Sequence, residues 1–379
     1  MKRLDFNLLK QNIEKAAEYD FVNNKVFGSA YCVIQGDETV YSNCLGYTSV
    51  ETEKKVDENT LFRLASMTKP ITAIAALILV ERGLLSLNDE ISEYLPEFKN
   101  PFITQRNDQN EFVNIGKAKK EVTVLNLLTH TSGIGSESLK SGKMTEEEIS
   151  TIDNTVKFYS QCGLDFEPGT RAQYSGTGAF DVLVKIIELI TKEDYLSFIK
   201  REIFEPCGMT NTTFVPTKEQ WENLIDMHTK TDGKNDVKKM KDNCVFANFP
   251  CTHYLGGAGL VSTLKDYTNF AKMLLNQGKT PEKQIVSPKT FSLLSTPYFP
   301  KGTVSSNQSW GLGVRIIVDN TYNGLPVGAF GWSGAYGSHF WIDPANKIAA
   351  VFMKNSLFDG GADNESGCNF EKAVNASFT

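Results

Sequence analysis

One stretch of the chain is apolar at nearly every position. From Ile71 to Leu79 the residues are apolar almost all round, which is typical of a helix that is buried on every side. Pro70 is tolerated only in the first turn of a helix, and Gly83 is a plausible helix end. The pattern therefore predicts a buried central helix that begins close to residue 70.

The residues before this helix predict one amphipathic helix and one hairpin. Leucine, isoleucine and alanine recur at helical spacing from Leu4 to Ala17, with charged residues between them. Two strand-like runs, 30–34 and 39–41, flank Gly36 and Asp37, which together are a turn signal.

The rest of the chain is first helical and loop-rich, and then strand-like. Polar stretches at 105–121, 136–152 and 229–243 predict surface insertions. Helical patterns cover 122–128, 180–191, 194–204, 266–276 and 370–376, and strand-like patterns cover 310–318, 338–342 and 348–353. The order of strands, helices and strands predicts an α/β (α+β) fold, with one antiparallel sheet built from both chain ends and covered by the terminal helices. We expect a discontinuous sheet domain (1–83 and 250–379) and a helical domain (84–249).

Composition excludes several classes of partner. The chain has 379 residues, of which 41% are hydrophobic and 11% aromatic, as in a globular protein with a large core. A net charge of −6 argues against a nucleic-acid partner, and the Lys-rich run 230–241 is interpreted as a solvated loop. The longest apolar run is too short to cross a bilayer, so we expect no membrane partner.

The seven cysteines predict neither a disulfide framework nor a metal site. Their number is odd, and Cys244 and Cys251 are too far apart for a C-x-x-C motif. The histidines show no ligand spacing either, so we expect no metal and no cofactor. The N-terminus lacks the continuous apolar core of a signal peptide, and we expect a cytoplasmic protein. The sequence leaves the oligomeric state open.

The most informative motif is Ser66-Met67-Thr68-Lys69, which directly precedes the buried helix. A serine three residues before a lysine places hydroxyl and amine on one helix face. A neutral lysine in that position can accept the serine proton and activate the nucleophile. The same spacing recurs at Ser197/Lys200 and at Ser262/Lys265, where an amphipathic helix and a capping pattern explain it. The motif alone is therefore weak.

Three further segments carry chemistry. Tyr174 lies between a turn and a helix, where a phenol can move a proton between nucleophile and leaving group. The segment 330–338 is rich in small residues, which let a substrate lie close to the backbone. The segment 254–263 is a glycine-rich turn before a helix. His130 invites a Ser-His interpretation, but its place at a helix end favours a structural role.

Taken in order along the chain, these segments resemble the serine β-lactamase and penicillin-binding-protein superfamily, on the side of class C β-lactamases and family VIII carboxylesterases. The matching segments are 62–89, 128–133, 168–175, 256–266 and 332–344. The resemblance covers roughly residues 25 to 355. It implies a β-lactamase-like fold, with the active site in the cleft between the two predicted domains.

The resemblance also implies roles for individual residues. Ser66 is implied as the acylated nucleophile, Lys69 as its general base, and Tyr174 as a partner in proton transfer. The backbone N–H groups of Ser66 and Ala335 are implied as the oxyanion hole, in which loss of one donor typically costs about 3 kcal/mol of transition-state stabilisation. The implied substrate-binding residues are Gly176, Trp332, Ser333, Gly334 and Tyr336, of which Tyr336 is better explained by packing.

Two departures from the class C pattern bear on the substrate. Gly176 replaces the asparagine of the second motif, and Trp332 replaces the lysine that begins the third. The site thereby loses an amide and a cation and gains a flat apolar surface, which favours an uncharged ester or acyl substrate. Three alternatives stay open: a β-lactamase or D,D-peptidase or D-amino-acid peptidase, an acyltransferase, and a catalytically silent binding or sensor module.

Overall fold

The computed structural model describes residues 2–23, 26–49, 51–135, 150–231, 234–238, 253–299, 307–319 and 322–379. Most of the predicted insertion at 136–152, the end of the Lys-rich run, and both Cys244 and Cys251 lie outside these residues. Among the described cysteines, Cys32, Cys44, Cys207 and Cys368 form no disulfide.

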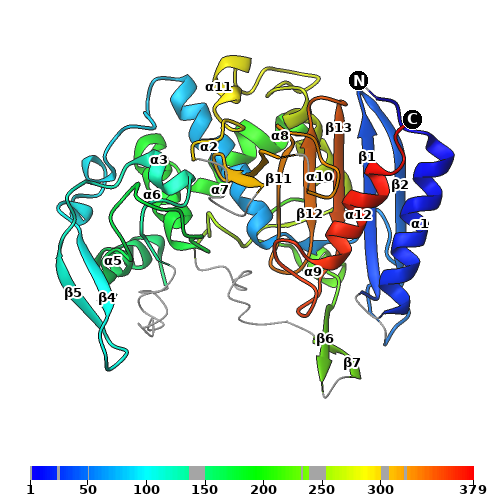
Figure 1. Ribbon diagram of the computed structural model, residues 1–379, viewed down its shortest axis with the longest axis horizontal. Helices are drawn as coiled ribbons and strands as arrows, with labels where there is room; N and C mark the ends of the chain where they lie inside the picture. The colour runs from blue at the N-terminus through cyan, green and yellow to red at the C-terminus, as the bar shows by residue number, and fades with distance from the viewer. Residues whose placement is uncertain are drawn as a thin grey trace.

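An antiparallel sheet joins the two ends of the chain (Figure 1). In the described residues it has seven strands in the order β2-β1-β13-β12-β11-β10-β9. These strands are β1 (Gly28–Gln35), β2 (Glu38–Gly46), β9 (Gln308–Trp310), β10 (Arg315–Ile317), β11 (Phe330–Ser333), β12 (His339–Asp343) and β13 (Ile348–Met353). Strands β1 and β13 pair from Ala30 opposite Met353 to Gln35 opposite Ile348. The predicted closure of the sheet by both chain ends is confirmed.

Helices cover both faces of this sheet. The terminal helices α1 (Phe6–Val22) and α12 (Glu365–Asn375) lie side by side on one face, as predicted (Figure 1). Their apolar residues, such as Ile13 and Phe370, pack with Tyr31 and Phe352 of the sheet. Helix α10 (Leu264–Leu275) packs on the other face against β1, β12 and β13. This second face belongs to the larger hydrophobic core of the molecule.

Helix α2 (Lys69–Glu81) runs through that larger core. Every residue from Lys69 to Leu79 is buried, and one turn of 3-10 helix, η1 (Ala65–Thr68), precedes it. Pro70 lies in the first turn, where no backbone donor is lost. Gly83 follows the helix with φ of 67°, a left-handed conformation that glycine adopts without strain. The central helix is therefore where the sequence predicted it.

Most of the regular elements described between α2 and α10 are helices. Its longer helices are α5 (Ile152–Cys162) and α6 (Gly178–Thr191), and α6 packs on both α2 and α5. The shorter helical elements in this part are η2 (Ile91–Glu93), η3 (Pro96–Phe98), α3 (Val124–Leu128), α7 (Tyr195–Ile199), a π-helical turn (Lys200–Phe204), α8 (Glu205–Cys207) and α9 (Lys218–Glu222). Another short helix, α11 (Pro288–Ser292), follows α10.

Two hairpins in this part of the chain were not predicted. Strands β4 (Phe102–Arg106) and β5 (Phe112–Lys117) pair and overlap the polar stretch 105–121, and β6 (Met227–Thr231) and β7 (Lys234–Lys238) pair and overlap the polar stretch 229–243. Strand β5 is exposed along almost all of its length, so it has no buried face to produce an apolar alternation. No alternation of apolar and polar residues therefore predicts a strand at β5.

The segment 310–318 was predicted as one strand, and this is wrong. The chain reverses between β9 and β10, which pair antiparallel with Arg315 opposite Trp310. Gly313 has φ of 67° in the turn, and the Gly311 amide donates to the Val314 carbonyl. A Cβ on Gly311 would lie 2.3 Å from the Leu294 carbonyl oxygen. The two glycines thus have a turn function that the flanking apolar residues conceal.

The division into two domains stays a proposal. A short ladder between β3 (Phe62–Arg63) and β8 (Val261–Ser262) joins the entry to α2 with the entry to α10. The backbone of His228 in β6 exchanges hydrogen bonds with Asn355 and Leu357, so this part of 84–249 lies against the end of β13.

Candidate active site

Ser66 is the one residue between Thr60 and Leu79 that is not buried. It lies in the 3-10 turn η1, directly after Ala65, whose φ of 45° is unusual for a residue with a side chain. Such conformations cost about 1–3 kcal/mol and persist where the surroundings hold them, often at functional sites. The fold thus brings one hydroxyl to the surface at the start of a buried helix.

Lys69 lies one turn later and is fully buried. Its Nζ is 3.3 Å from Ser66 Oγ, 2.6 Å from the Gly176 carbonyl oxygen and 2.8 Å from the Gly257 carbonyl oxygen. The lysines of the two other Ser-x-x-Lys sequences, Lys200 and Lys265, are exposed. Burial, which the tetrapeptide pattern does not encode, therefore separates Lys69 from both of them.

Tyr174 completes a cluster of polar contacts around Ser66. Its hydroxyl donates to Ser66 Oγ at 2.6 Å, and Trp332 Nε1 donates to the Tyr174 hydroxyl at 3.3 Å. The Tyr174 ring also lies 4.8 Å from Lys69 Nζ. Residues from three distant parts of the sequence thus converge on one hydroxyl.

An aromatic wall supports Tyr174. Trp310 stacks on its ring with centroids 5.8 Å apart and an interplanar angle of 17°. Trp332 and His130 approach the same ring at 5.4 and 4.7 Å. Trp310 was not among the predicted site residues, because it is more than a hundred positions from Tyr174 and their contact leaves no local pattern in the sequence.

The third motif is held against the serine by small residues. A Cβ on Gly334 would lie 2.4 Å from the carbonyl oxygen of Leu64, two residues before Ser66. Ala335 follows, and it is the one residue from Ala329 to Asp343 that is not buried. In the described part of the chain, the Ser66 and Ala335 amides donate no hydrogen bond to a protein group. Both are therefore available to a ligand.

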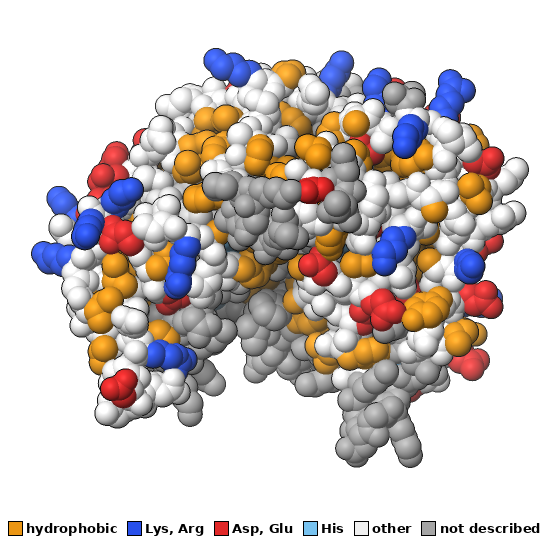
Figure 2. Space-filling model, viewed as in Figure 1, with side chains coloured by type: hydrophobic (Ala, Val, Ile, Leu, Met, Phe, Trp, Pro, Cys, Tyr) orange, Lys and Arg blue, Asp and Glu red, His pale blue; other side chains and the backbone are white. Residues whose placement is uncertain are grey.

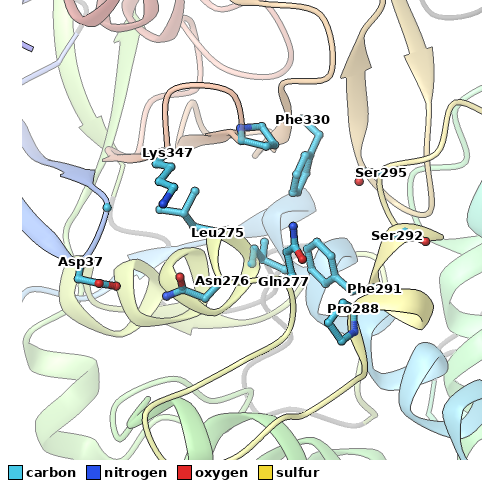
Figure 3. Close-up of a pocket in the computed structure, with 13 residues that line it drawn as sticks. Asp37, Leu275, Asn276, Gln277, Pro288, Phe291, Ser292, Ser295, Phe330 and Lys347 are labelled. Atoms are coloured by element: carbon cyan, nitrogen blue, oxygen red, sulfur yellow. The ribbon is translucent and has the colours of Figure 1, made fainter. Parts of the chain in front are cut away.

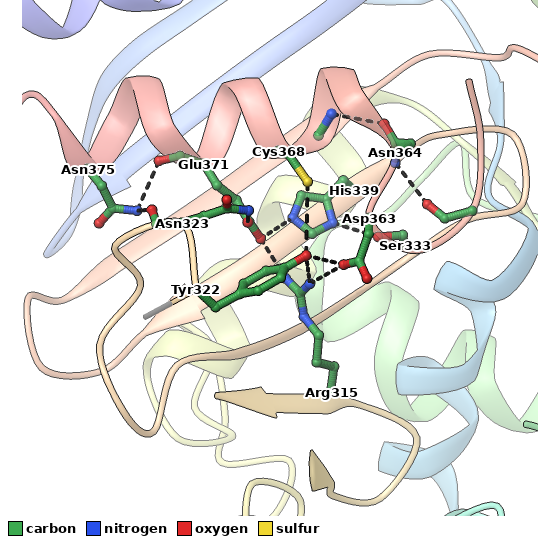
Figure 4. Close-up of polar contacts among 12 residues, drawn as sticks. Arg315, Tyr322, Asn323, Ser333, His339, Asp363, Asn364, Cys368, Glu371 and Asn375 are labelled. Carbon is green, nitrogen blue, oxygen red and sulfur yellow. Dashed lines mark hydrogen bonds and ion pairs between the residues drawn. The ribbon is translucent and has the colours of Figure 1, made fainter. Parts of the chain in front are cut away.

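The other two predicted substrate contacts point elsewhere. The Ser333 hydroxyl is buried and lies 2.8 Å from Nδ1 of His339, on the side of the sheet that faces α12 (Figure 4). Tyr336 is 4% exposed and packs with Ala65 and Met227, in agreement with the packing interpretation.

Gly256, Gly257 and the buried Asp181 complete the site around Lys69. The two glycines were predicted only as part of the glycine-rich turn 254–263. A Cβ on Gly257 would lie 2.6 Å from the Gly176 carbonyl oxygen and 3.1 Å from Lys69 Nζ, so a side chain there would displace the lysine. Asp181 accepts from the Gly256 amide at 2.9 Å and from the Tyr159 hydroxyl at 2.9 Å. Asp181 thus fixes the turn in which the Gly257 carbonyl oxygen accepts from Lys69.

Asp181 makes stability depend on pH. Burial raises its pKa from 3.8 to about 7, although hydrogen bonds from Tyr159 and Gly256 oppose the shift. As pH rises from about 4 to about 7, the unfolded chain loses this proton while the folded carboxyl keeps it, so the native state loses about 1.4 kcal/mol for each unit between the two pKa values. We expect Asp181→Asn to remove this loss. Urea unfolding at pH 5, 6, 7 and 8 measures this difference. As pH rises, the midpoint of the wild type should fall relative to the midpoint of Asp181→Asn.

The control for this measurement is Asp108→Asn, which replaces an exposed acid in the β4–β5 turn. Its midpoints should follow those of the wild type at each pH. Parallel curves for wild type and Asp181→Asn would contradict the assignment.

Other features of the described residues do not compete with this cluster. No group of three or more His, Cys, Asp or Glu side chains is arranged to hold a metal ion there. A cavity of about 360 Å³, shown in Figure 3, is lined by residues such as Asp37, Phe291 and Lys347 and includes no predicted site residue. Basic and acidic side chains are mixed on the face shown in Figure 2. None of the described helices has both the length and the apolar character needed to span a bilayer.

A serine hydroxyl that a buried lysine and a tyrosine both contact, at the head of a buried helix beside an antiparallel sheet, places the protein among the serine hydrolases. The model of the family described as Beta-lactamase matches residues 9–366. The chain belongs to this family, and the resemblance inferred from its motifs is confirmed.

Individual relatives agree with this assignment. Esterase EstB of Burkholderia gladioli is 26% identical over 390 residues, which cover 94% of this chain and 93% of EstB. The solved structure of EstCE1, described as a hydrolase with promiscuous acyltransferase activity, matches with a TM-score of 0.83, 22% identity, and coverage of 98% and 99% of the two chains. A family VIII carboxylesterase matches with a TM-score of 0.78, 17% identity and 97% coverage of each chain. The two structures establish the shared fold.

Proposed function

We propose that the protein hydrolyses uncharged carboxylic esters through an acyl-enzyme on Ser66. The observation that carries the proposal is the set of contacts at Ser66 Oγ, which lies 3.3 Å from Lys69 Nζ and 2.6 Å from the Tyr174 hydroxyl. One group can accept the serine proton while the other serves the leaving alcohol. The cluster thus contains what both halves of an ester hydrolysis require.

We propose that Lys69 acts as the base in its neutral form. A neutral amine has two N–H donors and one lone pair. The carbonyl oxygens of Gly176 and Gly257 match the two donors, which directs the lone pair to Ser66 Oγ. Lys69 then accepts the Ser66 proton as the Oγ–C bond forms.

Tyr174 is proposed as the proton relay to the leaving group. As the ester C–O bond breaks, the alcohol takes a proton through the Tyr174 hydroxyl, which Lys69 replenishes. Water then attacks the acyl-enzyme, gives its proton back along the same route, and releases the acid and the Ser66 hydroxyl. The ring contacts with Trp310 and Trp332 hold the phenol in place for both steps.

The amides of Ser66 and Ala335 are proposed as the oxyanion hole. They belong to the two positions at which otherwise buried stretches reach the surface. Gly334 supports this role, because a Cβ there would push the third motif away from Leu64 and widen the gap between the two amides. Such preorganised donors stabilise the charge of a tetrahedral intermediate.

Trp332 favours an ester over an anionic β-lactam or a peptide C-terminus. It offers Tyr174 an N–H donor, as a lysine would, but it adds no positive charge. A carboxylate on the substrate would then lose its water without gaining a cation in return. The family relatives that are named as esterases agree with this preference.

The test is a substrate panel on the intact protein. We expect turnover of short-chain p-nitrophenyl esters, little hydrolysis of nitrocefin and no release of D-alanine from a D-Ala-D-Ala peptide. A fluorophosphonate probe should leave one adduct, which peptide mass spectrometry should map to Ser66. Dominant nitrocefin or D-peptide turnover would refute the ester assignment, and absence of an adduct on Ser66 would favour a silent binding module.

A further inference from the structure

His130 holds the chain on both sides of Tyr174. Its backbone oxygen accepts from the Gln173 amide at 2.9 Å, and its ring Nδ1 accepts from the Ser175 amide at 3.2 Å. The imidazole itself lies 4.7 Å from the Tyr174 ring, between centroids. One residue thus contacts the tyrosine and fixes the peptide units before and after it.

The backbone of His130 is held in an unusual conformation to do this. It follows helix α3 with φ of 58°, in the left-handed region that residues with a side chain seldom adopt. This conformation is unfavourable for a residue other than glycine. The conformation persists because the carbonyl and the ring both bind the Tyr174 segment.

The contacts of the ring require a neutral imidazole. Nδ1 accepts a hydrogen bond, so the ring proton is on Nε2, and a second proton on Nδ1 would oppose the Ser175 amide. Burial lowers the pKa of His130 well below its usual value. Trp310 and Phe180 enclose the rest of the ring at 4.3 and 5.5 Å. His130 therefore has the surroundings of a fixed support, in contrast to a base that exchanges protons.

We propose that His130 is the positioning residue of Tyr174, a neutral clamp that sets the phenol hydroxyl against Ser66. The clamp rests on the proposed function in one respect, because it assumes that Tyr174 relays protons. It acts through the Gln173 and Ser175 amides, and among the described residues it forms no hydrogen bond with Ser66. The sequence indicated a structural role for this histidine, and the geometry now gives that role a catalytic target.

The test compares His130→Asn with His130→Gly. Both residues tolerate left-handed φ and both remove the ring, but only asparagine retains an acceptor in the position of Nδ1. We expect His130→Gly to lower kcat for a p-nitrophenyl ester by about 10- to 100-fold with KM changed less than about threefold, as displaced catalytic groups do. His130→Asn should recover most of this loss.

The same variants in a Tyr174→Phe background separate the clamp from a general loss of stability. If His130 acts through Tyr174, His130→Gly should cost little further activity once the phenol hydroxyl is gone. Equal losses with and without that hydroxyl, or equal losses for asparagine and glycine, would overturn the proposal. Full activity of Tyr174→Phe alone would instead refute the relay, which is a failure of the proposed function.

A measurement on the wild type tests the clamp even if the His130 variants do not fold. With four histidines in the chain, ¹⁵N spectra of labelled protein can resolve each ring. We expect the His130 ring, assigned through its neighbours Tyr174 and Trp310, to remain neutral, with its proton on Nε2, from pH 5 to pH 9. A His130 ring that gains a proton near pH 6 would overturn the clamp.

Discussion

Replacing Ser66 with alanine is expected to reduce ester hydrolysis by about four orders of magnitude or more, because removal of a covalent nucleophile typically has effects of this size. The neighbouring groups remain in place in this variant. Lys69 keeps its two carbonyl partners, and Tyr174 keeps its contact with Trp332. The loss would therefore report the missing Oγ itself and not a collapsed site. Initial rates with a short-chain p-nitrophenyl ester measure it directly.

The chain supplies a matched control for this variant. Ser197 also precedes a lysine by three residues, but Ser197 and Lys200 are both exposed. Ser197→Ala should keep the activity of the wild type, and it should still react with a fluorophosphonate at Ser66. Equal turnover by Ser66→Ala and the wild type would refute the acyl-enzyme.

The elements that the sequence predicted well are those with at least one strongly buried face. Helix α2 has an apolar run and clear end signals, and β13 consists of apolar residues throughout. The terminal helices also appear where their periodicity places them. Burial is what creates such patterns, so they can be recognised without knowledge of the partners.

The short and exposed strands could not be predicted from such patterns. Strand β5 has no buried face, and β9 and β10 are three residues each, separated by a glycine turn. Strands this short carry too few positions for an alternation to be distinguished from chance. Their pairing depends on neighbours that are distant in sequence, and a local pattern does not record those neighbours.

The motifs of the sequence predicted the central residues of the candidate site but not the residues that support them. Ser66, Lys69, Tyr174 and Trp332 were found because their motifs occur in a fixed order, and the structure brings their side chains into contact. The supporting residues were missed or left without a role. Asp181 acts through the Gly256 amide and His130 through the Ser175 amide. A backbone amide is present in almost every residue type, so the sequence does not show which position Asp181 or His130 contacts.

A buried ion pair beneath the third motif also escaped the sequence analysis. Arg315 Nη2 lies 2.5 Å from Glu371 Oε1, and both side chains are almost completely buried (Figure 4). The same carboxylate lies 2.9 Å from His339 Nε2, and Nδ1 of that ring lies beside the Ser333 hydroxyl. The pair thus connects α12 to β10, and the contacts of His339 in β12 extend this connection to Ser333 in β11, the strand that carries Trp332. Nothing in the local sequence of Arg315 or Glu371 predicts that they meet.

Glu371 should be among the most sensitive positions for stability. Burial alone would raise its pKa, but the Arg315 guanidinium and the His339 contact lower it to about 2. A carboxyl with a lowered pKa stabilises the fold above the unfolded value of 4.5 and loses that contribution as pH falls toward 2. Between pH 5 and pH 8 this contribution is therefore fully present.

Glu371→Gln is expected to lower the free energy of unfolding by about 3–5 kcal/mol at pH 7, because it leaves the Arg315 charge buried without its main partner. Asp363 is a weaker substitute, since its carboxylate is half exposed and lies 3.3 Å from Arg315 Nη1. Urea and thermal unfolding of the two proteins measure the loss. The control is Glu14→Gln, which breaks an exposed pair with Lys10 and should change stability by less than about 1 kcal/mol.

A double variant distinguishes the charge from the packing. Replacing both partners, as Arg315→Met with Glu371→Leu, removes the two buried charges together, and such replacements are often neutral or stabilising. We expect it to recover most of the loss seen in Glu371→Gln. If the double variant is as unstable as the single one, the fold depends on the hydrogen bonds to His339 and Asn323 and not on the ion pair. An unchanged midpoint in Glu371→Gln would contradict both explanations, because neither allows this carboxylate to be dispensable.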